Sequence, residues 1–324
     1  MKLIIDVDTG IDDALALLYV LASPEAELLA VTCTSGNVEA GQVAENTIAL
    51  LDLAGRSDIE VALGRREPLK RPLMIAPETH GPKGVGYAVL PPPSRGVSGR
   101  HSADLIAEEL RRAPGEVTLI TLGPLTNLAV AVEREPKLPR LARNLVMMAG
   151  SYRSPGNTAP TSEWNVACDP EAMQAVLSAW EAADGVGRPV ALGLDVTERA
   201  KFLPDHLARL HAAAGNPQSS PVLQFTDDAL RFYMEFHSRY DGFYGAFIHD
   251  ALAVASALDP SLLETEALPV QIELAGELTS GETVTDWRRV WGRQPNLDIG
   301  IRADVEQFFA RYIERVGGLA ARTV

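Results

Sequence analysis

Short apolar runs alternate with amphipathic stretches along most of this chain, and that alternation restricts the fold more than any other feature. Periodicity predicts strands over residues 2–7, 27–34, 59–63, 117–122, 144–149 and 188–194. It predicts helices over residues 12–22, 39–54, 102–113, 124–134, 169–179, 204–213, 221–240 and 250–257. Such alternation favours a Rossmann-like α/β fold, in which a mainly parallel sheet has helices on both faces. Ligands of these folds bind beyond the carboxyl ends of the strands.

The pattern changes after residue 265. Strand-like runs, "ALPVQIELAG", "ETVTDWRRVW" and "NLDIGIR", follow one another without helices, and a helix over 303–316 closes the chain. These runs predict a mixed or antiparallel C-terminal extension of the same fold. No linker rich in glycine, serine or charge divides the chain, so we predict a single domain over residues 1–324.

Composition narrows the class of protein. With 46% hydrophobic and 22% charged residues, the chain has a globular composition. It contains neither an apolar run long enough to span a membrane nor a signal peptide, so we expect a cytoplasmic protein without a membrane partner. Cys33 and Cys168 belong to no CxxC pair and are predicted to be free core thiols. The net charge of −14 argues against nucleic acid as a partner.

The stretch "IIDVDTGIDDALALL", residues 4–18, concentrates four carboxylates in one turn. Asp12 and Asp13 fall in the first turn of a helix, where each acidic side chain contributes about 0.3 to 1 kcal/mol. This does not account for Asp6 and Asp8, which end an apolar strand, because a cluster of buried carboxylates requires a compensating cation. Oxygen ligands in a cysteine-poor setting favour Ca²⁺ or Mg²⁺ over zinc. One of the two helix carboxylates can bind the metal while the other faces a metal-bound water.

The DxDTG pattern alone is also similar to that of the haloacid-dehalogenase-like phosphatases, in which the first aspartate is a nucleophile. That alternative requires Mg²⁺, a downstream lysine and a further acidic pair. No downstream stretch stands out as their source.

Taken together, seven motifs resemble the nucleoside hydrolases, the inosine-uridine-preferring family that cleaves the N-glycosidic bond of ribonucleosides. They run in the family's order and span nearly the whole chain: "DVDTGIDDALALL", "SGNVEAGQVAENT" at 35–47, "THGPKGVG" at 79–86, "TLGPLTNLA" at 121–129, "MMAG" at 147–150, "EWNVACDPEA" at 163–172 and "IHDALAVA" at 248–255.

The resemblance implies calcium-dependent release of a free base from a ribonucleoside by a homodimer or homotetramer. The implied Ca²⁺ ligands are Asp8, Asp13, the backbone carbonyl of Leu122, and Asp250. Asp12 would be the base toward the metal-bound water, and His249 would be the acid that protonates the leaving base. The implied substrate-binding residues are Asn37, His80, Met148, Asn157, Glu163 and Asn165.

Some features leave alternatives open. The chain has Pro82 and Lys83 where the family commonly carries an acidic pair, which affects the expected base preference more than the chemistry. Aromatic residues gather at 225–247, and the tract "YDGFYGAF" could form a wall that stacks on a base. The irregular stretches 65–100 and 150–168 are predicted to be functional loops. A ribose-binding module without turnover is the non-enzymatic alternative, against which Asp12 and His249 argue.

Overall fold

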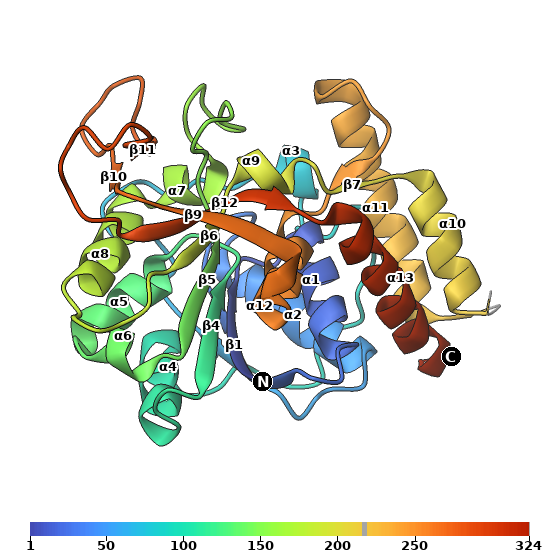
Figure 1. The fold of residues 1–324 in the computed structure, drawn as a ribbon. Coiled ribbons are helices and arrows are strands. Elements are labelled where there is room, and N and C mark those ends of the chain that lie inside the picture. The colour runs from blue at the N-terminus through green and yellow to red at the C-terminus, as the bar shows by residue number, and fades with distance from the viewer. Residues whose placement is uncertain (216–218, 324) are drawn as a thin grey trace.

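A computed structural model describes residues 1–215 and 219–323 as layers of helix around an eight-stranded sheet (Figure 1). The strand order is β3-β2-β1-β4-β5-β6-β12-β9. Each neighbouring pair is parallel except β12 and β9, which run antiparallel. The strands are β1 Lys2–Val7, β2 Glu27–Cys33, β3 Glu60–Leu63, β4 Val117–Thr121, β5 Asn144–Met148, β6 Val190–Leu192, β9 Leu263–Leu268 and β12 Leu297–Ala303. The prediction of a mainly parallel sheet with a mixed C-terminal extension is confirmed.

Helices cover both faces of the sheet. The β1 strand shows why, because Leu3, Ile5 and Val7 belong to one core cluster and Ile4 to the other. One face packs on α1 Ile11–Leu21, α2 Ala40–Leu53, α11 Pro221–Tyr240, α12 His249–Leu258 and α13 Val305–Arg322. The opposite face packs on α4 Ser102–Arg112, α5 Thr126–Arg134 and α8 Pro170–Glu181. These two groups lie on the right and left of Figure 1.

Several boundaries differ from the predictions. The strand predicted over 188–194 ends at Leu192 because Gly193 caps the short helix α9 Leu194–Thr197. The closing helix was predicted to stop at 316, before two glycines, but α13 continues to Arg322. A Cβ on Gly317 would lie 2.7 Å from the Cβ of Ala213 in α10 Pro204–Ala213, so this glycine allows two helices to approach closely.

The C-terminal strands are also divided differently from the predicted runs. Pro269 lacks a backbone N–H and ends β9 at Leu268, and the next residues form a separate two-stranded antiparallel sheet. This sheet consists of β10 Val270–Ile272 and β11 Thr283–Thr285, and a second small sheet pairs β7 Lys201–Phe202 with β8 Ala246–Phe247. Besides α9, four further short helices were not predicted: α3 Pro77–His80, α6 Leu138–Leu141, α7 Trp164–Cys168 and the 3₁₀ turn η1 Pro260–Leu262.

The strand order reverses direction beside β1. From β1 the chain builds outward through β2 and β3 on one side, and through β4, β5 and β6 on the other. The segments that leave β1 and β4 therefore diverge to opposite faces, and a crevice forms at the carboxyl ends of these strands. This topology brings Asp8, which follows β1, next to Gly123, which follows β4.

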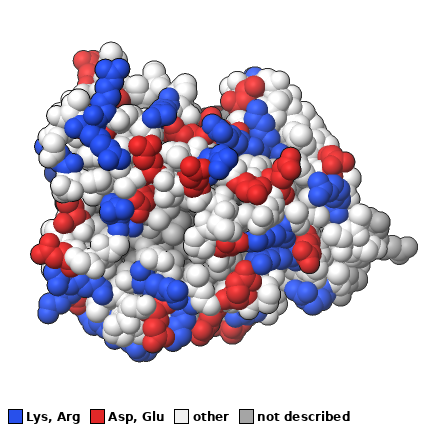
Figure 2. Space-filling view, viewed as in Figure 1, with Lys and Arg blue, Asp and Glu red and all other residues white. Residues whose placement is uncertain are grey.

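Both cysteines are buried and free, as predicted. Within the two described segments, no helix combines the length and the apolar character that crossing a membrane requires. Figure 2 shows acidic and basic side chains interspersed over the face seen in Figure 1, so that face carries no continuous basic surface.

Candidate active site

A cluster of buried carboxylates lies at the crevice beside β1. Asp8, Asp12, Asp13 and Asp250 have exposed fractions of only 1%, 6%, 0% and 2%. Carboxylate oxygens of Asp12, Asp13 and Asp250 lie within 4.8 Å of one another. The first two belong to α1, whereas Asp250 comes from the first turn of α12, which packs on α1. The fold therefore supplies the cluster from segments far apart in the sequence.

Asp8 sits against the backbone of two neighbouring loops. Its Oδ2 accepts a hydrogen bond of 2.8 Å from the backbone N–H of Asn37. A Cβ on Gly36 would lie 2.1 Å from Oδ2, and one on Gly123 would lie 2.7 Å from Oδ1. Any other residue at these two positions would therefore collide with the carboxylate.

Asp13 and Asp12 have different surroundings although they are adjacent. Asp13 accepts hydrogen bonds from the backbone N–H groups of Asp8 and Gly10 and from the Asn37 side chain, at 2.9 to 3.1 Å. Asp12 lines the pocket described below, and its Oδ1 has no hydrogen-bond partner among the described residues. One carboxylate is thus held rigidly beneath the floor of the pocket, and the other is left free to act within it.

The electrostatics of this cluster favour a bound cation. Burial, followed by the charge of Asp13, raises the pKa of Asp12 to about 8 and that of Asp8 well above its ordinary value. Burial and the charge of Asp12 do the same to the pKa of Asp250. Besides Asp12 Oδ1, the buried Asp8 Oδ1 has no hydrogen-bond partner among the described residues. Converging, unsatisfied carboxylate oxygens are the donors that a hard divalent cation prefers, so the residues fit a metal ion.

This arrangement sets an expected pH dependence of stability. Between the ordinary carboxyl pKa of 3.8 and the raised value of about 8, folded Asp12 binds more protons than the unfolded chain, so the free energy of unfolding falls as the pH rises. Buried His80 and His249, with pKa values lowered to about 3, have the opposite effect, but only below their ordinary pKa of 6.5. We therefore expect the melting temperature of chelator-treated protein to fall by on the order of 5 °C from pH 6.5 to pH 8.

Calorimetry in chelator and in excess calcium checks this expectation. The difference in melting temperature between the two conditions should widen toward pH 8, because the cation compensates charges that repel one another in its absence. A metal-free protein whose stability rises over this interval would contradict the account.

Asp6 does not join the metal-compatible group, although the sequence places it in the same acidic stretch. Its Oδ1 accepts hydrogen bonds from Thr32 and from Asn127, the latter at 2.8 Å. Burial raises the pKa of Asp6 to about 7. Asp6 therefore ties β1 to β2 and α5, behind the site.

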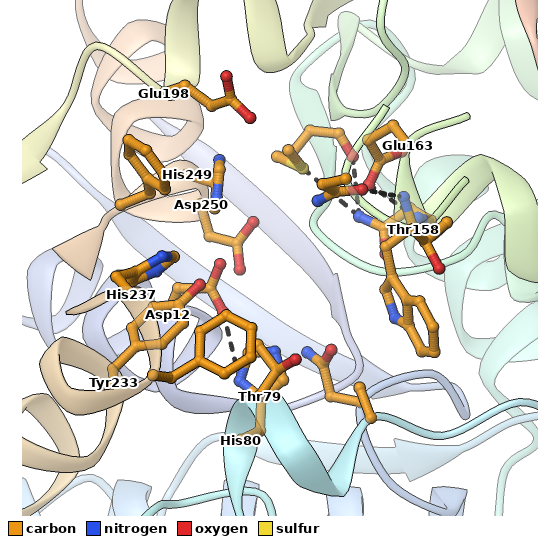
Figure 3. Close-up of a pocket in the computed structure, with 18 of the residues that line it drawn as sticks. Asp12, Thr79, His80, Thr158, Glu163, Glu198, Tyr233, His237, His249 and Asp250 are labelled. Carbon is orange, nitrogen blue, oxygen red and sulfur yellow. Dashed lines mark hydrogen bonds and ion pairs between the residues drawn. The ribbon is translucent and has the colours of Figure 1, made fainter. Parts of the chain in front are cut away.

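A pocket of about 600 Å³ opens above the carboxylates (Figure 3). Both predicted functional loops contribute to its walls: 65–100 through Thr79 and His80, and 150–168 through Thr158 and Glu163. The predicted residues that line it are Asp12, Asn37, His80, Leu122, Met148, Asn157, Glu163, Asn165, His249 and Asp250. Asp8 and Asp13 lie behind this lining.

The side of the pocket formed by the 150–168 loop is ordered by hydrogen bonds. Glu163 caps α7 and accepts bonds from the backbone N–H groups of Gly150, Asn165 and Val166 at 2.7 to 3.2 Å. The Asn165 side chain donates to the carbonyl of Leu122 at 2.6 Å and to that of Met148 at 3.1 Å.

Asn157 and Asn37 are held through some of their atoms and still face the pocket. Asn157 lies at the rim, where its Oδ1 accepts from the backbone N–H of Trp164 at 2.9 Å. Asn37 links Asp8 and Asp13 as described above and also lines the pocket. Both asparagines are therefore oriented by the fold.

In two histidines of the pocket, His80 and His249, one ring nitrogen is held by a hydrogen bond within the fold. The backbone N–H of Ile11 donates to Nδ1 of His80 at 3.1 Å, so the proton of neutral His80 is on Nε2. His249 places Nδ1 2.8 Å from the hydroxyl of Thr197, which leaves Nε2 for the pocket. Burial, followed by the charge of His237, lowers the pKa of both rings to about 3.

The sequence analysis named the aromatic residues at 225–247, several of which line the pocket, but it missed His237 among them. Tyr233, Phe236, His237 and Tyr240 follow the i, i+3, i+4, i+7 spacing of one helix face, and this was the signal that could have identified them. Most of the wall comes from this face of α11, with Phe247 beside it, rather than from the whole "YDGFYGAF" tract. Glu78 lies in the predicted loop 65–100 and Asp241 in the tract "YDGFYGAF", whereas Glu198 has no comparable signal and reaches the pocket only through the fold.

Comparison with known proteins decides the family. The model of the family described as inosine-uridine preferring nucleoside hydrolase matches residues 3–310. The chain belongs to this nucleoside hydrolase family. It is therefore an N-ribosyl hydrolase that acts on ribonucleosides, and the phosphatase and non-enzymatic alternatives are set aside.

Individual nucleoside hydrolases agree with this assignment. The pyrimidine-specific ribonucleoside hydrolase RihA of Enterobacter sp. (strain 638) is 36% identical to this chain, and the alignment covers 99% of each of the two chains. The inosine-uridine preferring nucleoside hydrolase of Crithidia fasciculata is 34% identical to this chain, and the alignment covers 98% of each of the two chains. The solved purine-preferring ribonucleoside hydrolase from Gardnerella vaginalis superposes with a TM-score of 0.91 at 28% identity, covering 99% of this chain and 100% of that one. The names of these relatives differ in base preference, so membership of the family does not fix the base.

Proposed function

We propose that this enzyme hydrolyses the N-glycosidic bond of ribonucleosides with a calcium ion, with Asp12 as general base and His249 as general acid. The ion would be held by Asp8, Asp13, Asp250 and the carbonyl of Leu122. The observation that carries the proposal is the convergence of the Asp12, Asp13 and Asp250 carboxylates, within 4.8 Å, at the pocket that also receives His249.

The set of donors favours calcium over magnesium. Calcium takes six to eight oxygen ligands in flexible geometry, whereas magnesium keeps several waters and few protein ligands. Several protein oxygens from separate segments suit the first ion better. When bound, calcium would orient the ribose 2′- and 3′-hydroxyls and lower the pKa of a water molecule.

Asp12 is the carboxylate best placed to take the proton of the attacking water. Asp13 is committed to three N–H donors, whereas Asp12 lines the pocket and its Oδ1 has no hydrogen-bond partner among the described residues. A positive charge beside Asp12 would lower its pKa from about 8 and favour the ionised form that a base requires. The surrounding carboxylates also stabilise the positive charge that develops on the sugar ring.

The remaining side chains would hold the ribose. Asn37, Asn157, Glu163 and Asn165 are fixed by hydrogen bonds around the pocket, and we assign them to the sugar hydroxyls. Met148 would lie beneath the ring, and we assign the Nε2–H of His80 to the substrate as a donor. As the resemblance implies, we propose a homodimer or homotetramer, which light scattering would test.

His249 is proposed to assist the departure of the base. Its Nδ1 is occupied by Thr197, so Nε2 is the atom that would deliver a proton to the ring of the leaving group. Burial lowers its pKa and therefore disfavours a charged imidazolium before the substrate enters. The Thr197 hydroxyl donates to the carbonyl of Gly193 and therefore accepts the Nδ1 proton, so Nε2 of the neutral ring must first gain a proton from water and can then deliver it to the departing base.

The proposal predicts that His249→Ala lowers inosine hydrolysis by roughly 10²-fold or more. Hypoxanthine leaves poorly as an anion and needs the proton, whereas p-nitrophenolate leaves unaided. The same variant should hydrolyse p-nitrophenyl riboside within about threefold of the wild-type rate. Steady-state kinetics on both substrates measure the effect, and equal losses on the two would assign His249 to folding, metal geometry or sugar binding instead.

A further inference from the structure

The short helix α9 contacts two segments of the site, although none of its own residues lines the pocket. Its apolar side chains are fully buried and belong to the core on one face of the sheet: Leu194 and Val196. Its polar side chains contact different segments. Thr197 holds Nδ1 of His249, and Asp195 contacts the 150–168 loop. A helix fixed in the core is thus able to align groups that come from separate parts of the chain.

The carboxylate of Asp195 accepts hydrogen bonds from three consecutive backbone N–H groups of this loop. Its Oδ2 accepts from Tyr152 at 2.9 Å, and its Oδ1 accepts from Arg153 at 2.7 Å and from Ser154 at 3.1 Å. Hydrogen bonds to a carboxylate are about twice as strong as those between neutral groups. One side chain therefore fixes the path of the backbone over these three residues.

The backbones of α9 and of the loop are also in direct contact. The N–H of Leu194 donates to the carbonyl of Gly150 at 3.0 Å. A Cβ on Gly193 would lie 2.7 Å from ring carbons of Tyr152, so only glycine allows this approach. The position of the loop is therefore set relative to α9.

The residues anchored by Asp195 lead directly to the sugar side of the pocket. Asn157 and Thr158 line the pocket shortly after Ser154. Each residue over 153–158 is exposed or half-buried, so burial contributes little to holding this segment. The nearby Trp287 adds one neutral hydrogen bond, of 3.2 Å, to the loop at the Tyr152 carbonyl. The carboxylate of Asp195 is the stronger of these two anchors.

An ordered loop binds its ligand more tightly than a mobile one. If a segment adopts its binding conformation only part of the time, the apparent affinity falls in proportion to that fraction. A side chain that orders the loop in advance thus removes a cost that the substrate would otherwise bear.

We propose that Asp195 is a positioning residue of the hydrolase, whose carboxylate holds residues 152–158 in the conformation that binds the ribose. The inference rests on the proposed function, in which Asn157 contacts the sugar. Figure 3 places Thr158 and Glu163 across the pocket from His249. Asp195 and Thr197 therefore act on opposite sides of the pocket, one on the sugar-binding loop and the other on the proposed acid.

Steady-state kinetics of Asp195→Ala test the inference. Inosine and p-nitrophenyl riboside carry the same sugar, so KM should rise by about 10- to 50-fold for both, and kcat should stay within about threefold of wild-type. Asp195→Asn keeps the oxygen that accepts from Arg153 and Ser154, so its KM should rise by only about threefold. This partial rescue distinguishes positioning of the loop from a general loss of stability.

The other polar residue of α9 should give the contrasting pattern. Thr197→Val removes the partner of Nδ1 of His249 and should lower kcat for inosine by about 10-fold, while p-nitrophenyl riboside is hydrolysed at nearly the wild-type rate. Asp52 is the matched control, because it also holds a loop, through Ser57 and the backbone of Ser94 at 2.6 and 2.8 Å, and lies outside the pocket. Asp52→Ala should leave both KM values unchanged.

Trypsin measures the order of the loop without any substrate. Arg153 is exposed, and cleavage after it requires the segment to leave α9. In Asp195→Ala, cleavage at Arg153 should be about fivefold or more faster than in wild-type, because proteolysis follows the population of the opened segment. Mass spectrometry identifies this site among the other tryptic sites.

The outcomes separate the inference from the proposed function. A KM near the wild-type value for both substrates in Asp195→Ala, a loss confined to inosine, or unchanged cleavage at Arg153 would overturn the inference. If that variant does not fold, an unchanged KM in Asp195→Asn would overturn it. Failure of the wild-type enzyme to release ribose from p-nitrophenyl riboside, inosine and uridine would instead overturn the proposed function.

Discussion

Replacing Asp12 with asparagine is expected to lower ribonucleoside hydrolysis by about 10²- to 10⁴-fold and to leave metal binding in place. Asparagine keeps the shape of the side chain and an oxygen at Oδ1, but it cannot take a proton from water. The effect should appear in kcat more than in KM, because the interaction that is lost is made only during the reaction.

The neighbouring residue is the matched comparison for this variant. Asp13 accepts three hydrogen bonds from N–H donors, so Asp13→Asn disturbs the position of the cluster and is expected to weaken metal binding together with hydrolysis. Single-turnover kinetics and titration calorimetry with calcium distinguish the two patterns. A near-normal rate in Asp12→Asn would mean that another group is the base and that the roles of the two aspartates are wrongly assigned.

Removing the carboxylate of Asp250 is expected to abolish both metal binding and activity. This side chain is the only one in the group of three convergent carboxylates that α12 contributes, and the other two are on α1. In Asp250→Ala the bound calcium should fall from about one ion per chain to below about 0.1, and hydrolysis should fall by roughly 10³-fold or more. Asp8→Ala should behave in the same way. Elemental analysis of desalted protein and steady-state kinetics measure the two effects.

A buried carboxylate outside the cluster provides the control. Asp169 caps α8 and accepts hydrogen bonds from Thr126 and from the backbone of Leu69, at 2.7 and 2.9 Å. Asp169→Asn should lower the melting temperature and leave about one calcium per chain. The metal assignment would be wrong if the wild-type protein held stoichiometric zinc or kept full activity after exhaustive chelation.

The fold shows which structural features are encoded locally. Each central strand and long helix was predictable, because a period of two or 3.6 is visible within a few residues. The pairing of β12 with both β6 and β9 was not, since it joins segments far apart in the chain and depends on which edge of the sheet remains open. The extent of α13 was missed for a similar reason, as Gly317 ends a helix by local propensity but here packs against Ala213.

The acidic residues of the site that lie close together in the sequence could be predicted more fully than the residues that come from other segments. Asp8, Asp12 and Asp13 lie within one turn, so their crowding is visible in the sequence and requires a physical explanation. Asp250 and His249 could be linked to them only through the family resemblance, because nothing local connects α12 with α1. The distinction between a rigid Asp13 and a free Asp12 depends on hydrogen bonds that only the folded backbone supplies.

The sequence by itself therefore determined the α/β class, the family, and the presence of a buried anionic turn that needs a cation, because these follow from local periodicity and short motifs. The tertiary structure decided which carboxylates converge, which ring nitrogen of His80 and of His249 is held by a hydrogen bond, and that Glu198, His237 and Asp241 belong to the pocket wall. The physical reason is distance along the chain. Burial, hydrogen-bond partners and electrostatic fields at the site come from segments that meet only after the sheet has formed and the helices have packed on it.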